Sequence, residues 1–248
     1  MKKKFSIITC TKNSDSTLEQ SILSLDNQTY TDYEHIFIDA YSTDKTLSIC
    51  HNAKNSKVVQ KKLSLYQSLN YGIQLAKGEI VFFLHSDDYL YKNNILKKIS
   101  DIFNENPTLD LVYGNILIKN KNSKKIVRNW KSGIMSKFFI NNFVMPPHTS
   151  IFYKKSLFDK VGLFDEQYKV ASDFEHMNRI FRNKKINFFY FDEYVLMMDS
   201  GGLSGKSFLN VVLQNIDNIK IMLKYGGKTT LLPYYLLIKF CVKLKQFF

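Results

Sequence analysis

Apolar residues in the first 110 positions alternate between short continuous runs and stripes with helical spacing. The runs predict strands at residues 5–9, 34–39, 58–59 and 79–84. Between them, apolar residues three or four positions apart predict helices at residues 16–25, 44–53, 65–77 and 93–104. The first of these helices is expected to begin at a capping box, Ser16–Glu19. This alternation predicts a mostly parallel central sheet with helices on both faces.

The pattern changes after residue 110. Here we expect strands at residues 111–118, 151–153 and 188–191, and helices at residues 132–143, 155–161, 172–182 and 208–225. A Lys/Asn-rich stretch, residues 119–125, is typical of a solvated hairpin or loop. No internal repeat or linker interrupts the chain. We therefore predict an α/β protein with one Rossmann-like domain over residues 1–205 and a C-terminal helical extension over residues 206–248.

Polar residues collect where the predicted parallel strands end. Thr9, Thr11 and Asn13 follow the first strand, Asp39 closes the second, and His85–Asp88 follow the apolar strand at 79–84. In open parallel sheets, ligands bind beyond the carboxyl ends of the strands. These residues are therefore the candidates for a ligand site.

Two adjacent carboxylates, Asp87 and Asp88, end the most apolar strand. Their repulsion is relieved by a hard divalent ion such as Mn²⁺ or Mg²⁺, held together with substrate phosphates. The alternative is a helix N-terminus, where one acid caps and the second favours the helix dipole. The chain has no Gly-x-x-x-x-Gly-Lys-Ser/Thr loop and no Gly-x-Gly-x-x-Gly after the first strand, which argues against ordinary kinases and nicotinamide dehydrogenases.

The chain of 248 residues carries a formal charge of +13, which indicates an anionic partner. The charge is uneven: residues 1–110 hold 13 cations and 13 acids, residues 111–199 hold 15 and 8, and residues 200–248 hold 7 and 1. Arginine occurs only at positions 128, 179 and 182. Because base reading relies on the forked guanidinium, a nucleic-acid partner is not expected. The positive charge instead indicates a membrane surface or a phosphate-bearing ligand.

The chain holds three cysteines with no close pair, Cys10, Cys50 and Cys241, so we expect small buried side chains rather than disulfides or a zinc site. The apolar run after Lys2–Lys4 is too short for a signal peptide, and no run of about 20 apolar residues is present. These features predict a cytoplasmic protein.

A set of short motifs resembles glycosyltransferase family 2, the inverting type with the GT-A fold, in family order over residues 5–205. The matching segments are residues 5–13, 24–39, 42–46, 66–73, 76–88 and 164–175. The resemblance implies a bacterial surface-glycan enzyme that moves a sugar, a hexose or an N-acetylhexosamine, from a nucleotide-sugar, most simply a UDP-sugar. The acceptor would be a saccharide or a polyprenyl-pyrophosphate-linked lipid. Residues 1–110 would form the donor half and residues 111–205 the acceptor half.

The resemblance also implies roles for individual residues. Thr9, Thr11 and Asp39 match the segments that hold the base and ribose, and Asn70 and Gly72 match an Asn-x-Gly on the helix that closes over the nucleotide. Asp87 matches the last acid of the metal-binding Asp-x-Asp, with Asp88 beside it. Asp173 matches the general base that takes the proton of the acceptor hydroxyl. The alternatives are that Asn70 caps or bridges a turn and that Asp173 is the N-cap of its helix, a role compatible with catalysis.

The sequence departs from the family at His85, which stands where the motif has its first acid, and at Ala40 and Gln67, which are often acidic. His85 and Gln67 raise a second hypothesis, a non-catalytic relative that binds glycans or membranes. His148 and the pair Gly201 and Gly202 resemble segments on the acceptor side, the glycines as a mobile loop or an ordinary turn.

The basic and aromatic tail, residues 228–248, has apolar residues nearly all round, with Lys239, Lys243 and Lys245 interspersed. Such a segment can lie in an anionic membrane interface and make the protein peripheral on the inner face of the cytoplasmic membrane. Alternatively it packs on the catalytic domain or on a second subunit, which would make the protein a homo-oligomer. Pro233 permits a helix that starts there.

Overall fold

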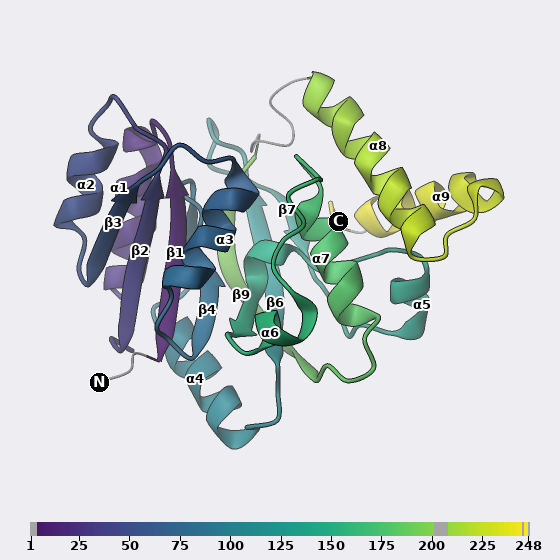
Figure 1. Cartoon of the computed structure of the whole chain (residues 1–248), viewed down its shortest axis with the longest axis horizontal. Coiled ribbons are helices and arrows are strands. Elements are labelled where there is room, and N and C mark those ends of the chain that lie inside the picture. Colours follow the sequence, from purple (N-terminus) through teal and green to yellow (C-terminus); the bar gives the residue numbers. More distant parts are fainter. Residues whose placement is uncertain (1–3, 201–207, 245, 248) are drawn as a thin grey trace.

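The computed structural model describes residues 4–200, 208–244 and 246–247 (Figure 1). The strands are β1 (Phe5–Thr11), β2 (Tyr33–Asp39), β3 (Ser56–Gln60), β4 (Ile80–Phe83), β5 (Asp88–Leu90), β6 (Leu111–Lys119), β7 (Ile126–Trp130), β8 (Ile151–Lys154) and β9 (Phe188–Asp199). The α-helices are α1 (Asp15–Asp26), α2 (Thr46–Asn52), α3 (Leu65–Leu75), α4 (Ile95–Glu105), α5 (Lys137–Asn141), α6 (Leu157–Val161), α7 (Ser172–Phe181), α8 (Phe208–Lys224) and α9 (Leu232–Leu244). Short 3₁₀ helices are η1 (His148–Ser150) and η3 (Thr229–Leu231).

All of these strands belong to one sheet, in the order β3-β2-β1-β4-β8-β6-β9-β5, with β7 added to β6. The strands β3, β2, β1 and β4 are parallel, as the alternation of strands and helices predicts. The second half is mixed, because β8 runs antiparallel between β4 and β6 whereas β6 and β9 are parallel. The parallel half therefore brings the ends of β1, β2 and β4 to one edge, where ligands bind in such sheets.

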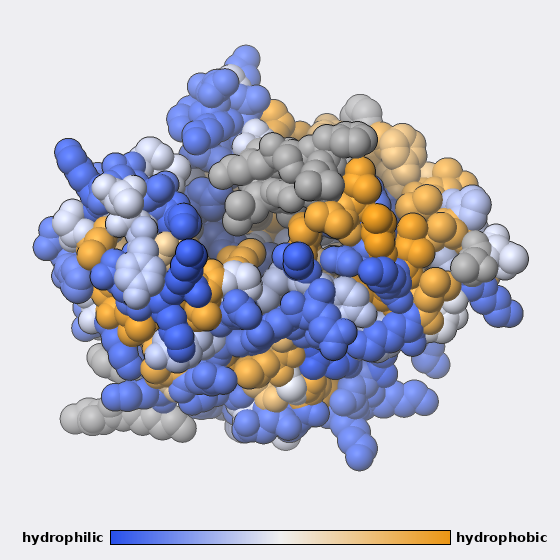
Figure 2. All heavy atoms as spheres, turned by 45° about the horizontal axis from the view of Figure 1, so that its top comes forward, coloured by the Kyte–Doolittle hydropathy of each residue, from blue (hydrophilic) through white to orange (hydrophobic). Residues whose placement is uncertain are grey.

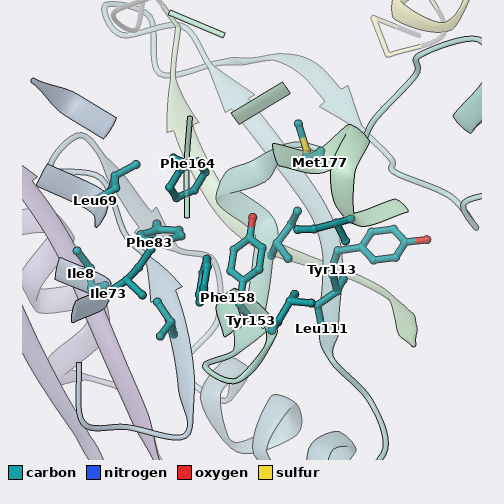
Figure 3. Packing of buried hydrophobic residues seen from close by; sticks show 14 of the residues in the cluster. Ile8, Leu69, Ile73, Phe83, Leu111, Tyr113, Tyr153, Phe158, Phe164 and Met177 are labelled. Carbon is teal, nitrogen blue, oxygen red and sulfur yellow. The ribbon is translucent and has the colours of Figure 1, made fainter. Parts of the chain in front are cut away.

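Helices cover both faces of the sheet. On one face, α3, α6 and α7 pack against β1, β4, β6 and β8, through Leu69, Ile73, Phe158 and Met177 among others (Figure 3). On the opposite face, the Ile95, Leu96 and Ile99 side chains of α4 pack into a second cluster with Phe82 and Phe152. Because apolar residues cover both faces, the central strands carry almost continuous apolar runs.

Several element boundaries differ from the sequence-based expectations. The first helix begins at Asp15, so the capping box expected at Ser16–Glu19 is wrong. Of the helix expected over residues 132–143, only residues 137–141 are helical, as α5. Two strands are additional, β5 directly after the 85–88 turn and β7 after the 120–125 hairpin, and β9 continues to Asp199. Strand β5 is held by its pairing with β9, and β7 by its pairing with β6. The local sequence pattern does not reveal such pairing between distant segments.

The C-terminal helices α8 and α9 lie beside α5 and α7 (Figure 1), where Met222 and Tyr235 pack with Phe143. The α9 helix begins at Leu232 with Pro233 in its first turn, as expected. Lys239 does not reach outward, because its amine lies 4.2 Å from the centre of the Phe174 ring, and burial lowers its pKa to about 8. Among the described helices, none combines the length and the apolar character that a membrane crossing requires.

The predicted boundary at residue 205 lies outside the described residues and stays a prediction. The cysteines of the described residues are free; Cys50 is buried as expected, whereas Cys241 is exposed.

Candidate active site

Asp39, at the end of β2, is a fully buried carboxylate that accepts hydrogen bonds on both oxygens. Its Oδ1 accepts from the hydroxyls of Thr11 at 2.9 Å and Ser42 at 2.5 Å, and its Oδ2 accepts from the Ser42 amide at 2.9 Å and the Gln60 amide group at 3.4 Å. Burial by itself would raise the pKa of Asp39, but these donors outweigh it and lower that pKa. The carboxylate therefore holds the ends of β1, β2 and β3 together as an anion.

Thr9 is also fully buried, and its hydroxyl is engaged inside the protein. The hydroxyl donates to the Leu84 carbonyl oxygen at 2.6 Å and lies 2.9 Å from His35 Nε2. Since the hydroxyl has a single hydrogen, His35 donates from Nε2 and holds Thr9 in place. Thr9 thus links β1 to Leu84, the residue that precedes the His85–Asp88 turn, and holds this turn in place against β1.

Asn13 follows β1 on an exposed loop with φ of +48°. Its amide N–H donates to the Ser42 hydroxyl at 2.9 Å, and its side-chain oxygen accepts from the Thr43 amide at 2.9 Å. Next to it, Ser14 lies 3.2 Å from the Ser86 hydroxyl. The loops after β1, β2 and β4 are therefore hydrogen-bonded to one another, which joins the residues that the sequence placed at the ligand edge.

Asn70 and Gly72 both lie on α3 and have structural roles. The Asn70 side chain accepts from the Phe164 amide at 3.0 Å and donates to the Phe164 carbonyl oxygen at 3.0 Å and to Glu166 Oε1 at 2.9 Å. A Cβ at Gly72 would lie 2.5 Å from Ile8 Cγ2, so glycine lets α3 approach β1. Asn70 thus bridges α3 to the 164–166 segment.

The two carboxylates after β4 have different surroundings. Asp87 is half-buried in the turn, whereas Asp88 starts β5 and is 1% exposed. The Asp88 Oδ2 atom is buried and has no hydrogen-bond partner among the described residues. Burial, together with the nearby carboxylates of Asp87 and Asp199, raises the pKa of Asp88 well above its usual value. A cation close to Asp88 would relieve this cost.

Asp173 lies in the first turn of α7, and both of its oxygens have partners. Oδ1 accepts from the Tyr66 hydroxyl at 3.0 Å, and Oδ2 lies 3.1 Å from His148 Nδ1. Burial tends to raise the pKa of Asp173, but His148, the Phe174 amide and the Tyr66 hydroxyl outweigh it and lower that pKa. Asp173 is therefore ionised at neutral pH and held in one orientation.

His148 also contacts His85, since their Nε2 atoms are 3.2 Å apart. His85 comes from the turn after β4, so this contact joins the turn of Asp87 to the helix of Asp173. Burial, reinforced by His148, lowers the pKa of His85 to about 3, so His85 is neutral. The structure thus brings together His85, His148 and Asp173, which come from segments that are far apart in the sequence.

Sequence reasoning missed the roles of Tyr66 and Glu175. No local signal in the sequence marks the Tyr66 hydroxyl as a partner of Asp173. Glu175 is 1% exposed and accepts from Arg179, Lys224 and Tyr225. Its place two residues after Asp173 on a helix with one apolar face was the only available signal. Gly201 and Gly202, expected on the acceptor side, lie outside the described residues.

Comparisons with known sequences show which family the chain resembles. The model of glycosyl transferase family 2 matches residues 6–186. A PGL/p-HBAD biosynthesis glycosyltransferase of Mycobacterium bovis is 29% identical over 208 residues, which cover 81% of this chain and 78% of the relative. The poly(ribitol-phosphate) β-N-acetylglucosaminyltransferase TarP of Staphylococcus aureus is 33% identical over 185 residues, which cover 69% of this chain and 55% of TarP.

Solved structures share the fold. S. aureus TarS 1–349 in complex with UDP-GlcNAc aligns with a TM-score of 0.64 at 19% identity, over 88% of this chain and 66% of that one. A longer TarS chain aligns with a TM-score of 0.64 at 23% identity, and this chain spans 36% of its length. These alignments confirm the predicted GT-A fold. The family match over residues 6–186 leads to one assignment: the chain belongs to glycosyltransferase family 2.

Proposed function

We propose that this glycosyltransferase inverts the anomeric centre of a sugar that it moves from a nucleotide donor, most simply a UDP-sugar, to a saccharide or lipid-linked acceptor in bacterial surface-glycan assembly. The donor half is residues 1–110, the acceptor half residues 111–205 and the extension residues 206–248. Complexes of TarS with UDP and with UDP-GlcNAc support the choice of a UDP donor. The relatives named for PGL/p-HBAD biosynthesis and for poly(ribitol-phosphate) support a surface glycan as the setting.

The state of Asp173 is the observation that carries this proposal. In-line displacement at the anomeric carbon needs one base, which takes the proton of the acceptor hydroxyl as the new bond forms. Asp173 is an oriented carboxylate whose pKa lies below its usual value, so it is ionised and ready to accept a proton. No second carboxylate is needed, because no covalent glycosyl-enzyme forms.

The other proposed donor residues act mainly by shaping the site. Asp39 and Thr11 hold the ends of β1 and β2, where the base and ribose would lie. Thr9 and Asn13 fix the flanking loops. Asn70 and Gly72 set the position of α3 against β1 and the 164–166 segment, so they would act on the nucleotide through backbone placement.

A divalent ion, Mn²⁺ or Mg²⁺, fits the turn after β4. The unpartnered, buried oxygen of Asp88 and the half-buried Asp87 carboxylate would hold it, with donor phosphates as further ligands. The described residues hold no group of three or more His, Cys, Asp or Glu side chains arranged for a metal. When bound, such an ion stabilises the charge that builds on the leaving diphosphate. A Pyrobaculum calidifontis mannosyltransferase of the same fold was solved with GDP-Man and Mn²⁺.

Binding of the donor is testable without knowledge of the acceptor. With UDP-sugars at about 100 times Kd, the stabilisation should be about 2.7 kcal/mol, which raises Tm by about 5–10 °C for a chain of this size. The rise should be smallest when the chelator EDTA replaces Mn²⁺ or Mg²⁺. A thermal-shift panel of nucleotide-sugars, with and without each metal, measures this and identifies the donor.

The matched variants are Asp87→Asn and Asp159→Asn. Asp87→Asn should remove the metal-dependent part of the rise in Tm, whereas Asp159→Asn, on an exposed position of α6, should keep it. If no nucleotide-sugar changes Tm and none is hydrolysed or transferred, the non-catalytic glycan- or membrane-binding alternative holds instead.

We extend the proposal to an anionic membrane surface that contacts the tail, residues 228–248. The inner face of α9 carries Tyr235 and Lys239, which pack on Phe143 and Phe174. Its outer face carries Leu237, Phe240 and Leu244, which are spaced three or four residues apart and exposed. Figure 2 shows apolar side chains gathered on the side of the molecule that carries α8 and α9. Exposed Lys243 adds a positive charge beside this face.

Replacement of Leu237 and Phe240 by glutamate should lower binding to vesicles that contain phosphatidylglycerol by about 100-fold. Two inserted side chains contribute about 3 kcal/mol in total, and each 1.4 kcal/mol is about tenfold in affinity. Vesicle co-sedimentation measures the partition coefficient. Leu23→Glu on α1, at 58% exposed, is the matched control and should bind as the unmodified protein does.

Unchanged vesicle binding by the double variant would contradict the membrane proposal. In that case, light scattering distinguishes the alternatives. A dimer that dissociates in the double variant would assign the outer face of α9 to a second subunit.

A further inference from the structure

Three side chains from distant segments form one chain of polar contacts. His85 Nε2 lies 3.2 Å from His148 Nε2, and His148 Nδ1 lies 3.1 Å from Asp173 Oδ2. The three residues come from the turn after β4, from η1 and from the first turn of α7. These contacts therefore connect the turn after β4, on the proposed donor side, to Asp173, the proposed base.

The direction of the last contact follows from its chemistry. Asp173 is ionised and accepts only, so His148 must donate to it from Nδ1. One hydrogen then lies between the two Nε2 atoms of His85 and His148. Whichever ring donates there, His85 limits how the His148 ring can turn. His148 is thus held at both ring nitrogens, as an orienting side chain should be.

We propose that His148 is a positioning residue, which aims the Asp173 carboxylate at the acceptor hydroxyl, and that His85 positions His148. Tyr66 holds the other oxygen of Asp173 at 3.0 Å, so the two partners together leave the carboxylate one orientation. His85 thereby has a role at the place where the family motif carries an acid. The inference rests on the proposed function of Asp173.

This role differs from an acceptor contact, which the sequence resemblance had suggested for His148. A side chain that only binds the acceptor has no effect when water replaces the acceptor. A side chain that orients the base affects both reactions equally, because the same carboxylate takes the proton from water. Hydrolysis of the nucleotide-sugar selected in the thermal-shift panel therefore separates the two roles.

The experiment measures nucleoside diphosphate release from that nucleotide-sugar, with water as the acceptor, in His148→Ala, His148→Asn and His148→Gln. His148→Ala should lower kcat about 10- to 100-fold, with the donor KM within about twofold, because a base displaced by about 1 Å loses about that much. His148→Asn should restore kcat to within about threefold, since its amide N–H lies where Nδ1–H was. His148→Gln, whose amide lies closer to the position of Nε2, should remain as slow as alanine. His51→Ala, at an exposed position of α2, is the control.

A double-mutant cycle tests the part played by His85. His85→Ala should lower kcat less than His148→Ala does, and should have no further effect when His148 is already alanine. If His85→Ala lowers kcat by the same factor in the His148→Ala background as in the unmodified protein, His85 acts on the donor directly. That result would contradict the proposed role of His85 in positioning His148.

The outcomes also separate this inference from the proposed function. The positioning role is overturned if His148→Ala hydrolyses the donor at the unmodified rate, or if His148→Asn and His148→Gln are equally slow. The proposed function survives either result as long as Asp173→Asn is inactive. If Asp173→Asn is itself fully active, the proposed function fails first. Should His148→Ala not fold, the comparison of the Asn and Gln variants decides the matter, since both keep a polar side chain of similar size.

Discussion

Replacement of Asp173 by asparagine should lower kcat about 10²–10⁴-fold, the range that a positioned general base contributes. The substitution keeps the size of the side chain and its place in the first turn of α7. It removes the negative charge, so the amide cannot take the proton of the attacking hydroxyl. Because the donor is held elsewhere, its Kd should stay within about twofold.

Nucleoside diphosphate release measures kcat, and isothermal titration of the donor measures Kd. Asp159→Asn is the control, an acid-to-amide change at an exposed position of α6. Since the pKa of Asp173 lies below the usual value of 3.8, its carboxylate should be ionised down to about pH 4, and hydrolysis should show no loss attributable to this group above that pH. Full activity of Asp173→Asn would rule out the assigned base.

Replacement of Glu175 by alanine should lower the free energy of unfolding by about 1.5–3 kcal/mol, the range for hydrogen bonds to a charged group, because the Lys224 and Arg179 side chains that remain are partly exposed to water. Glu175 Oε1 accepts from Lys224 Nζ at 2.8 Å and from the Tyr225 hydroxyl at 2.6 Å, and Oε2 accepts from Arg179 Nη2 at 2.7 Å. Lys224 ends α8 and Tyr225 follows it directly, so this carboxylate holds the extension against α7. Loss of the Glu175 carboxylate should therefore also weaken the attachment of α8 to α7.

The contribution of Glu175 depends on pH. Burial tends to raise its pKa, but Lys224, Tyr225 and Arg179 outweigh burial and lower the pKa below the usual value of 4.5. A lowered pKa means that the stabilisation is present above about pH 4.5 and is lost as the pH falls through the folded-state value. The difference between the unmodified protein and Glu175→Gln should accordingly shrink in acid.

Urea unfolding at pH 7 and at pH 4 measures both effects. Glu105→Ala, at the exposed end of α4, should change the free energy of unfolding by less than about 0.5 kcal/mol. If Glu175→Ala unfolds at the same urea concentration as the unmodified protein at pH 7, the buried cluster does not anchor the extension.

Much of the parallel half of the fold was predictable from the sequence. Strands β1, β2, β3 and β4 and the helices between them follow from apolar runs and helical spacing, which record whether each position is buried. The site residues Thr11, Asp39 and Asp87 were predictable for the same reason, since they stand where buried strands end. Strands β5 and β7 were not, because pairing with β9 and β6 determines them.

The sequence by itself determined the family, placed the candidate ligand residues at the ends of buried strands and gave Asp173 as the candidate base, because motifs and strand ends can be recognised along the chain. Only the tertiary structure decided that His148 and Tyr66 hold Asp173, that His85 contacts His148, that Asn70 forms hydrogen bonds with the 164–166 segment, and that Gly72 lets α3 approach β1. These contacts join residues 25 to 107 positions apart, such as Tyr66 and Asp173. Such pairs depend on how helices and strands pack in three dimensions, and the spacing of apolar residues carries no record of that packing.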